Sequence, residues 1–122
     1  MSEEGKVAKR ILVIDDDRTI LEAIATILED MGYQVDGFTK SPDGEKAALS
    51  SDYDLILIDL RMPEKDGAAV TKSILAARPK AKVLIITGYP TDPLARRALD
   101  AGARGLLKKP FEIGKVLDHL SG

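Results

Sequence analysis

The sequence predicts a three-layer α/β domain in which five parallel strands alternate with five helices. Three short runs, Ile11–Ile14, Leu55–Ile58 and Val83–Ile86, are almost continuously apolar and rich in β-branched residues, as is typical of strands buried on both faces. Segments with helical spacing of apolar residues lie between them. Strands that alternate with helices form one parallel sheet with helices on both faces. The pattern fills residues 10–122, and residues 1–9 are expected to form a polar tail.

The first predicted strand, Ile11–Ile14, leads into a helix that begins after Asp17 and ends at Gly32. Aspartate side chains accept N–H groups at helix starts, and glycine adopts the left-handed conformation that often ends a helix. Apolar residues at helical intervals define the expected buried face of this helix: Ile20, Ile24, Ile27, Leu28 and Met31. An alternating run, Tyr33–Phe38, predicts the next strand.

The second helix is expected to have Ser41 as its N-cap and Pro42 at its first position, and to continue to Leu49. The third helix is predicted over Gly67–Ala77, where Pro79 stops it.

The fourth helix is expected to be capped by Thr91 and to end near residues 101–102. A short apolar run, Gly105–Leu107, predicts the fifth strand, and a fifth helix is expected over Glu112–Leu120. The apolar face of that last helix consists of Ile113, Val116, Leu117 and Leu120.

Composition excludes several classes of function. The 122 residues include no cysteine and a single histidine, His119, which rules out disulfide scaffolds, thiol catalysis and zinc sites built from thiolates or several histidines. Lys and Arg total 18 against 20 Asp and Glu, without a basic block, which argues against direct nucleic-acid binding. The polar N-terminus and the lack of a long apolar run predict a cytoplasmic protein with no membrane segment.

Polar side chains follow four of the predicted strands. Asp15 and Asp16 come directly after the first strand, Asp59 after the third, Thr87 after the fourth and Lys109 after the fifth. Because ligands of open parallel sheets bind beyond the carboxyl ends of the strands, these groups converge at one edge. Clustered carboxylates favour a hard cation such as Mg²⁺, and a lysine and a hydroxyl suit phosphoryl oxygens. The residues therefore predict a Mg²⁺-dependent phosphoryl site.

Two established classes of protein could use these acids. The run Asp15-Asp16-Asp17-Arg18-Thr19 matches the DxDxT motif of haloacid dehalogenase phosphohydrolases, with Asp15 as nucleophile and Asp17 as acid/base. That family also needs an acidic strand end after the lysine, whereas the 13 residues after Lys109 read as a helix. The hydrolase would also leave Asp59 without a role.

The chain from about Arg10 to Leu120 resembles the receiver domains of response regulators. Four motifs carry the resemblance, in order: Ile11-Leu12-Val13-Ile14-Asp15-Asp16-Asp17, Asp54-Leu55-Ile56-Leu57-Ile58-Asp59-Leu60-Arg61-Met62-Pro63-x-x-Asp66-Gly67, Val83-Leu84-Ile85-Ile86-Thr87-Gly88 and Gly102-Ala103-x-Gly105-x-x-Lys108-Lys109-Pro110-Phe111. The resemblance implies a flavodoxin-like (βα)5 fold with strand order 2-1-3-4-5, for which this family is a standard example.

The resemblance also implies the roles of the site residues. Asp59 would be the phosphoacceptor, and Thr87 and Lys109 would each bind a phosphoryl oxygen. The Mg²⁺ cofactor would be held by these groups: Asp15 through a bound water, Asp16, Asp59 and the backbone carbonyl of Arg61. The Lys109–Pro110 bond would be cis, and Lys108 would point away from the site.

The partners follow from the same resemblance. A sensor histidine kinase or a phosphotransfer protein would supply the phosphoryl group, and a downstream protein or output domain would read the fourth helix and fifth strand. Such a domain is a signalling switch in a two-component phosphorelay, not an enzyme beyond its own phosphotransfer and autodephosphorylation. A homodimer through the fourth helix, fifth strand and fifth helix is also compatible with the family.

One position departs from the family. Many members carry an aromatic residue where this chain has Leu106, so the coupling of Thr87 to an aromatic rotamer is expected to be absent. Arg61 and Tyr89, each two residues after a site residue, are expected to flank the attacking water and to tune the lifetime of the aspartyl phosphate. A phosphorylation-independent interaction module on the same fold remains an alternative.

Overall fold

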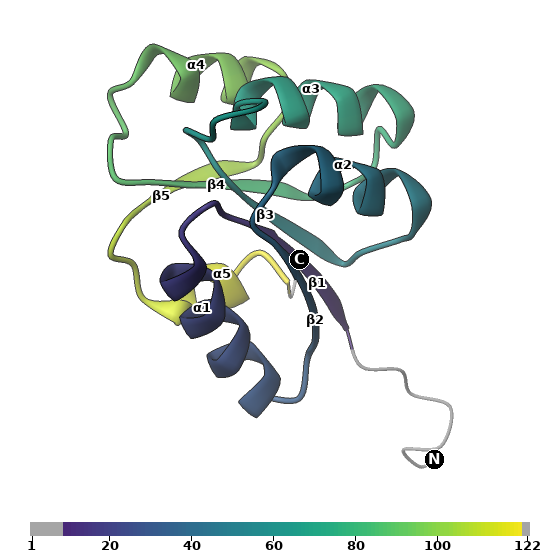
Figure 1. Ribbon diagram of the computed structural model, residues 1–122, viewed down its shortest axis with the longest axis vertical. Coiled ribbons are helices and arrows are strands. Elements are labelled where there is room, and N and C mark those ends of the chain that lie inside the picture. The colour runs from purple at the N-terminus through teal and green to yellow at the C-terminus, as the bar shows by residue number, and fades with distance from the viewer. Residues whose placement is uncertain (1–8, 121–122) are drawn as a thin grey trace.

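The computed structural model describes residues 9–120 and contains one five-stranded parallel sheet with strand order β2-β1-β3-β4-β5. The elements have the following bounds: β1 (Arg10–Ile14), α1 (Arg18–Asp30), β2 (Gln34–Phe38), α2 (Ser41–Ser50), β3 (Leu55–Asp59), α3 (Gly67–Ala77), β4 (Val83–Thr87), α4 (Pro93–Asp100), β5 (Gly105–Lys108) and α5 (Ile113–Leu117). The predicted doubly wound fold and its strand order are confirmed (Figure 1).

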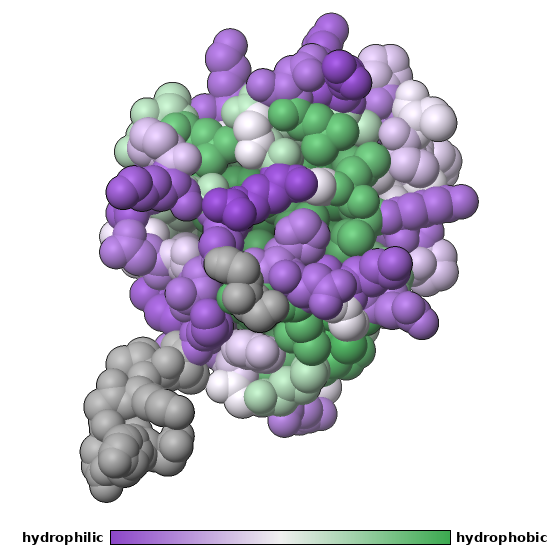
Figure 2. All heavy atoms as spheres, turned by 180° about the vertical axis from the view of Figure 1, so that it is seen from behind, coloured by the Kyte–Doolittle hydropathy of each residue, from purple (hydrophilic) through white to green (hydrophobic). Residues whose placement is uncertain are grey.

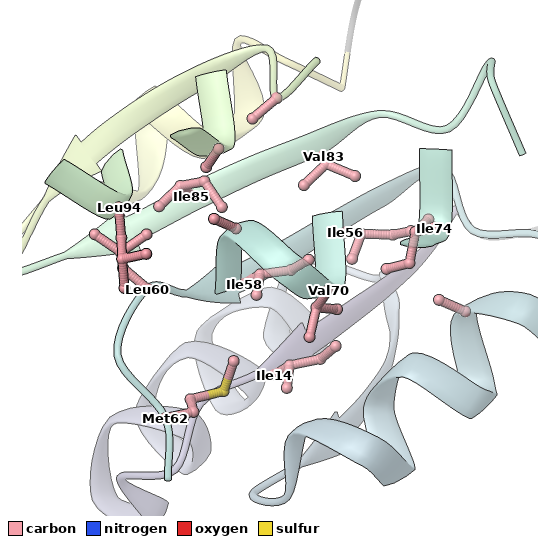
Figure 3. Close-up of a cluster of buried hydrophobic side chains, with 14 of the residues drawn as sticks. Ile14, Ile56, Ile58, Leu60, Met62, Val70, Ile74, Val83, Ile85 and Leu94 are labelled. Carbon is pink, nitrogen blue, oxygen red and sulfur yellow. The ribbon is translucent and has the colours of Figure 1, made fainter. Parts of the chain in front are cut away.

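Helices cover both faces of the sheet, so the core consists of two layers. α2, α3 and α4 pack on one face, and α1 and α5 pack on the other (Figure 1). Side chains of a strand alternate between faces. Ile14, Ile58 and Ile85 therefore belong to the layer under α2, α3 and α4 (Figure 3), whereas Leu57 and Leu84 face α1 and α5. Each fully buried side chain of this kind contributes about 1.5–3 kcal/mol to stability.

The ends of α1 agree with the sequence prediction. Asp17 is the N-cap, and its Oδ1 accepts the N–H groups of Thr19 and Ile20 at 3.0 and 3.2 Å. Gly32 follows the helix with φ of 98°, a conformation that side chains other than glycine rarely adopt.

The predicted buried face of α1 is only partly correct. The residues that the sheet covers are Leu21, Ile24 and Leu28. Ile27 and Met31 are 45% and 47% exposed, and Met31 is the C-cap residue that follows the last helical position. Spacing alone could not separate the two neighbouring apolar stripes, since both repeat at helical intervals.

Two predicted helix caps are wrong. Ser41 is the first residue of α2 and not its N-cap, and its Oγ instead accepts the backbone N–H of Lys65 at 3.0 Å. At the start of α4, Asp92 replaces Thr91 as the N-cap, with Oδ1 accepting the N–H of Leu94 at 2.9 Å. Asp92 directly precedes the helix and its carboxylate is the stronger acceptor for the exposed N–H groups.

The last helix is shorter than predicted. α5 ends at Leu117, and residues 118–120 form tighter turns in which the N–H groups of His119 and Leu120 donate three residues back, at 3.1 and 3.0 Å. Val116 and Leu120 are still buried, as the predicted apolar face requires, while Ile113 is only partly covered.

Most of the predicted polar tail, residues 1–9, lies outside the described residues. Lys9 is described and joins the domain: its carbonyl accepts the N–H of Gln34 at 2.9 Å, and its Nζ donates to the carbonyl of Leu120 at 3.2 Å. Within residues 9–120 none of the helices combines the length and the apolar character needed to cross a bilayer.

On the face turned away in Figure 1, hydrophobic side chains reach the surface between hydrophilic ones (Figure 2).

Gly67, at the start of α3, is required by a close approach of two backbone segments. Its N–H donates to the carbonyl of Leu60 at 2.8 Å. A Cβ atom at this position would collide with the backbone oxygen of Asp59 and would lie 3.0 Å from Cα of Leu60. Neither obstacle is a flexible side chain, so the absence of a side chain at Gly67 determines how closely α3 approaches the end of β3.

We expect Gly67→Ala to lower the free energy of unfolding by about 2 kcal/mol, because the added methyl group must displace the backbone at Asp59. Urea denaturation followed by circular dichroism measures the change. Gly114→Ala in α5 is the matched control, because nothing lies within 4 Å of a Cβ placed there. Equal stability of the two variants would contradict the close approach.

Candidate functional site

The sheet brings the predicted site residues together at its carboxyl edge. Asp15 follows the last residue of β1, Asp59 ends β3, Thr87 ends β4 and Lys109 follows the last residue of β5. Asp15, Asp59 and Thr87 are 0%, 8% and 2% exposed, whereas Asp16 is exposed. Four strands thus deliver three acids, a hydroxyl and an amine to one small region, as the strand ends predict.

Three carboxylates form a compact acidic cluster. One oxygen from each of Asp15, Asp16 and Asp59 lies within 4.8 Å of the others. Oδ1 of Asp15 accepts the N–H of Asp17 at 2.9 Å, which orients that carboxylate at the carboxyl end of β1. Clustered carboxylate oxygens are the ligands that Mg²⁺ and Ca²⁺ prefer, so the cluster can hold a divalent cation.

Lys109 lies between two of these acids. Its Nζ donates to Oδ2 of Asp15 at 2.8 Å and to Oδ1 of Asp59 at 3.3 Å. Oδ1 of Asp59 also accepts the backbone N–H of Leu60 at 2.9 Å. The Lys109 amine and the Leu60 N–H thus both donate to Oδ1. Among the described residues, no backbone N–H and no lysine amine donates to Oδ2 of Asp59. Lys108 is exposed, consistent with its predicted outward direction.

Burial and repulsion govern the pKa of the Asp59 carboxyl group. Burial, followed by the charge of Asp15, raises the pKa of Asp59 to about 7, and Lys109 only partly opposes this rise. Burial works against the charged form of Lys109, but the hydrogen bond to Asp15 and the charges of Asp59 and Asp15 outweigh it and raise the pKa of the amine. One ammonium group therefore does not balance the acids, and a divalent cation would relieve the remaining repulsion.

Thr87 is positioned by two backbone contacts. Its Oγ1 accepts the N–H of Tyr89 at 2.9 Å, which leaves the hydroxyl proton available to a ligand. Its carbonyl accepts the N–H of Lys109 at 2.7 Å, and the Lys109–Pro110 peptide bond is cis, as the resemblance implies. Tyr89, which is predicted to flank the attacking water, is 72% exposed.

The loop after β3 is fastened to helices on both sides. Nζ of Lys65 lies 2.8 Å from an oxygen of Glu45 in α2 and donates to Oγ of Ser73 in α3 at 3.0 Å. On the α4 side, the guanidinium of Arg61 pairs with Asp92 through two hydrogen bonds of 2.6 and 2.9 Å. The loop that follows Asp59 is therefore held at both ends.

These tethers are absent from the sequence prediction. The only available signal for Asp92 is its place directly before Pro93, which is typical of an N-cap followed by the first helical position. Nothing in the sequence pairs it with Arg61, which lies 31 positions away.

Comparison with known proteins identifies the family. The model of the response regulator receiver domain matches residues 11–121, so the chain belongs to this family, whose members act in two-component signalling. Protein CcdB of Bacillus subtilis is 36% identical over 115 residues, which cover 92% of this chain and 94% of that protein. The transcriptional regulatory protein DltR of Streptococcus agalactiae is 34% identical over 111 residues, 91% of this chain. The chain spans 50% of the length of DltR.

Solved structures share the fold. A CheY-like receiver domain protein from Methanospirillum hungatei has a TM-score of 0.88 at 30% identity, with 94% of this chain and 92% of that chain covered. A response regulator from Burkholderia pseudomallei, with a phosphorylated aspartic acid, a calcium ion and citrate, has a TM-score of 0.84 at 29% identity over 92% of this chain and 66% of that chain. The receiver domain of the histidine kinase PA1611 from Pseudomonas aeruginosa, with magnesium in its active-site cleft, has a TM-score of 0.85 at 26% identity over 94% and 96%.

The raised pKa of Asp59 predicts a pH-dependent loss of stability in the absence of divalent cations. Between about pH 4 and about pH 7 the folded chain keeps a proton on Asp59 that the unfolded chain has already released, so stability falls as the pH rises through this range. Asp59→Asn cannot ionise there, and we expect it to be more stable than the unsubstituted chain above pH 7 by about 2 kcal/mol.

Urea denaturation at about pH 5 and about pH 8, with a chelator present, measures this difference. Asp30→Asn, which removes an exposed acid at the end of α1, is the control and should keep the pH dependence of the unsubstituted chain. A pH dependence of Asp59→Asn identical to that of the control would refute the electrostatic description of the site.

Proposed function

We propose that the domain is a phosphoacceptor switch, in which Asp59 takes a phosphoryl group from the phosphohistidine of a sensor histidine kinase or a phosphotransfer protein. The observation that carries the proposal is the position of the Lys109 amine, which contacts both Asp15 and Asp59 at an edge where Thr87 also ends a strand. The Burkholderia relative with a phosphorylated aspartic acid supports the same chemistry.

Asp59, Lys109 and Thr87 have separate roles in phosphoryl transfer. Oδ2 of Asp59 attacks phosphorus, a P–O bond forms, and the P–N bond to the donor imidazole breaks, with the electron pair returning to that nitrogen. Lys109 can leave Asp15 partly and bind a phosphoryl oxygen, and the hydroxyl of Thr87 can donate to another. Both groups belong to strand ends, so little reorganisation is needed.

The acidic cluster fits the expected cofactor, Mg²⁺. Asp15, Asp16 and Asp59, with the backbone carbonyl of Arg61, would hold the ion, which neutralises charge between carboxylate and phosphoryl oxygens when bound. The magnesium in the PA1611 receiver domain supports this choice of metal.

The domain then acts as a switch and not as an enzyme on an external substrate. Transfer to and loss from Asp59 are its own reactions, and a downstream protein or an output domain would respond to the surface around α4 and β5. The chain matches only 50% of the length of DltR, a transcriptional regulatory protein. This supports an output region within the same longer protein as one kind of partner.

Two contacts argue against the hydrolase alternative. Asp15, its expected nucleophile, is fully buried, and its two oxygens already accept from Lys109 and from the N–H of Asp17. Asp17, its expected acid/base, accepts two backbone N–H groups as the N-cap of α1. Neither carboxylate is arranged for turnover of phosphate esters.

We expect the chain to form a phosphoryl adduct when incubated with Mg²⁺ and a small phosphodonor, and to bind beryllofluoride under the same conditions. Intact-mass spectrometry at neutral pH detects the adduct, which Asp59→Asn should lack because an amide is not a nucleophile for phosphorus. Steady phosphate release that depends on Asp15 would favour the hydrolase, and no adduct at all would favour an interaction module.

Adjacent lysines allow a matched test of the amine. Lys109→Gln should reduce the yield of the phosphoryl adduct by tenfold or more, roughly 1.4 kcal/mol, because the amine contacts Asp59 and would neutralise a phosphoryl oxygen. Lys108→Gln removes the same charge from the exposed neighbour and should leave the yield unchanged. Phosphorylation time courses of the two variants compare them, and equal losses would contradict the assigned role of Lys109.

A further inference from the structure

A bidentate ion pair joins the two loops beside the site. The guanidinium of Arg61 donates from Nε to Oδ2 of Asp92 at 2.6 Å and from Nη2 to Oδ1 at 2.9 Å. Arg61 belongs to the loop after β3, two residues beyond Asp59, and Asp92 is the N-cap of α4. This pair thus connects the loop of the acceptor carboxylate directly to the start of α4.

The two partners differ in how firmly they are held. The side chain of Asp92 is only 10% exposed, and its Oδ1 also accepts the N–H of Leu94 at 2.9 Å. The hydrogen bond from Arg61 and that from Leu94 lower the pKa of Asp92, so the carboxylate stays charged. The side chain of Arg61 is 63% exposed, and the ion pair with Asp92 is its only hydrogen-bonded contact within residues 9–120. Arg61 is therefore the partner held by fewer contacts.

The acceptor carboxylate lies within reach of the same guanidinium. Consecutive Cα atoms are about 3.8 Å apart, so those of Asp59 and Arg61 are separated by at most about 7.6 Å. A phosphoryl group adds up to about two negative charges and three acceptor oxygens at this point. Guanidinium groups bind carboxylates and phosphates with the same planar pair of N–H donors. Asp92 and a phosphorylated Asp59 would then compete for the guanidinium of Arg61.

A chain of backbone contacts leads from Thr87 to the same N-cap. The N–H of Tyr89 donates to Oγ1 of Thr87 at 2.9 Å, and the N–H of Asp92 donates to the carbonyl of Tyr89 at 3.1 Å. A ligand that engages Thr87 therefore acts on the loop that carries Asp92, through contacts that do not involve Arg61.

We infer that Asp92 is a positioning residue for the phosphorylated site, an inference that rests on the proposed phosphorylation of Asp59. Asp92 holds the guanidinium of Arg61 against the N-terminus of α4, and a phosphoryl group on Asp59 competes with Asp92 for it. Transfer of Arg61 to the phosphoryl group detaches α4 from the β3–α3 loop. This gives α4 a response to phosphorylation that requires no aromatic residue at Leu106.

Titration with beryllofluoride in the presence of Mg²⁺, followed by amide NMR, tests the competition. Asp92→Asn keeps an equally good N-cap acceptor and removes the charge that holds Arg61. We expect this variant to bind beryllofluoride about threefold to fivefold more tightly than the unsubstituted chain. Asp100→Asn, which breaks the ion pair with Arg96 on the same helix, is the matched control and should leave the affinity unchanged.

A double-mutant cycle and a side-chain signal separate positioning from a general structural effect. In an Arg61→Ala background, Asp92→Asn should no longer change the affinity, because no guanidinium remains to be shared. The Nε–H resonance of Arg61 should shift on adduct formation in the unsubstituted chain. An unchanged affinity of Asp92→Asn, an equal effect in both backgrounds or a static Arg61 resonance would overturn the inference. Absence of any adduct on the unsubstituted chain would overturn the proposed function, and this inference with it.

Discussion

The position of the Lys109 ammonium between two buried carboxylates is the interaction on which the arrangement of the site depends. Asp15 has no exposed surface and Asp59 has 8%, and the ammonium group is a hydrogen-bond donor and positive charge in contact with both buried side chains. The two contacts also join β1, β3 and the end of β5, which are distant in the sequence. A single amine does not neutralise the acids beside it, so the edge retains excess negative charge that favours a divalent cation.

Such an edge is unfavourable for stability, and the rest of the fold compensates for it. β3 and β4 are buried along their whole length, and helices on both faces supply two apolar layers, of which Figure 3 shows the one under α2, α3 and α4. The buried polar residues of β3 and β4, Asp59 and Thr87, end their strands, and Gly67 lets α3 approach the backbone of Asp59. The position of Asp59 therefore follows from packing of the core, while its pKa depends first on burial and then on Asp15 and Lys109.

Burial on both faces explains why the strands are easy to predict from the sequence. The apolar runs define β3 and β4 to within one residue, and the extra residues, Asp59 and Thr87, are those of the site. Helix starts are harder because neighbouring polar residues compete for the same N–H groups, as Thr91 and Asp92 do. The ion pair between Arg61 and Asp92 joins two loops, and local pattern carries no information about such a contact.

Leu106 makes this unpredicted contact important for the output of the domain. In a receiver domain whose fifth strand carries an aromatic residue, a ring can follow the movement of the site threonine, but Leu106 has neither a ring nor a hydroxyl. Hydrogen bonds from two directions link the site to the N-cap at Asp92, one path from Thr87 through Tyr89 and the other from Arg61. Because Asp92 also holds the first turn of α4 through Leu94, a change of its partner acts on the end of the helix nearest the site. In the mechanism that we infer, exchange of this one ion pair carries a charge change at Asp59 to α4.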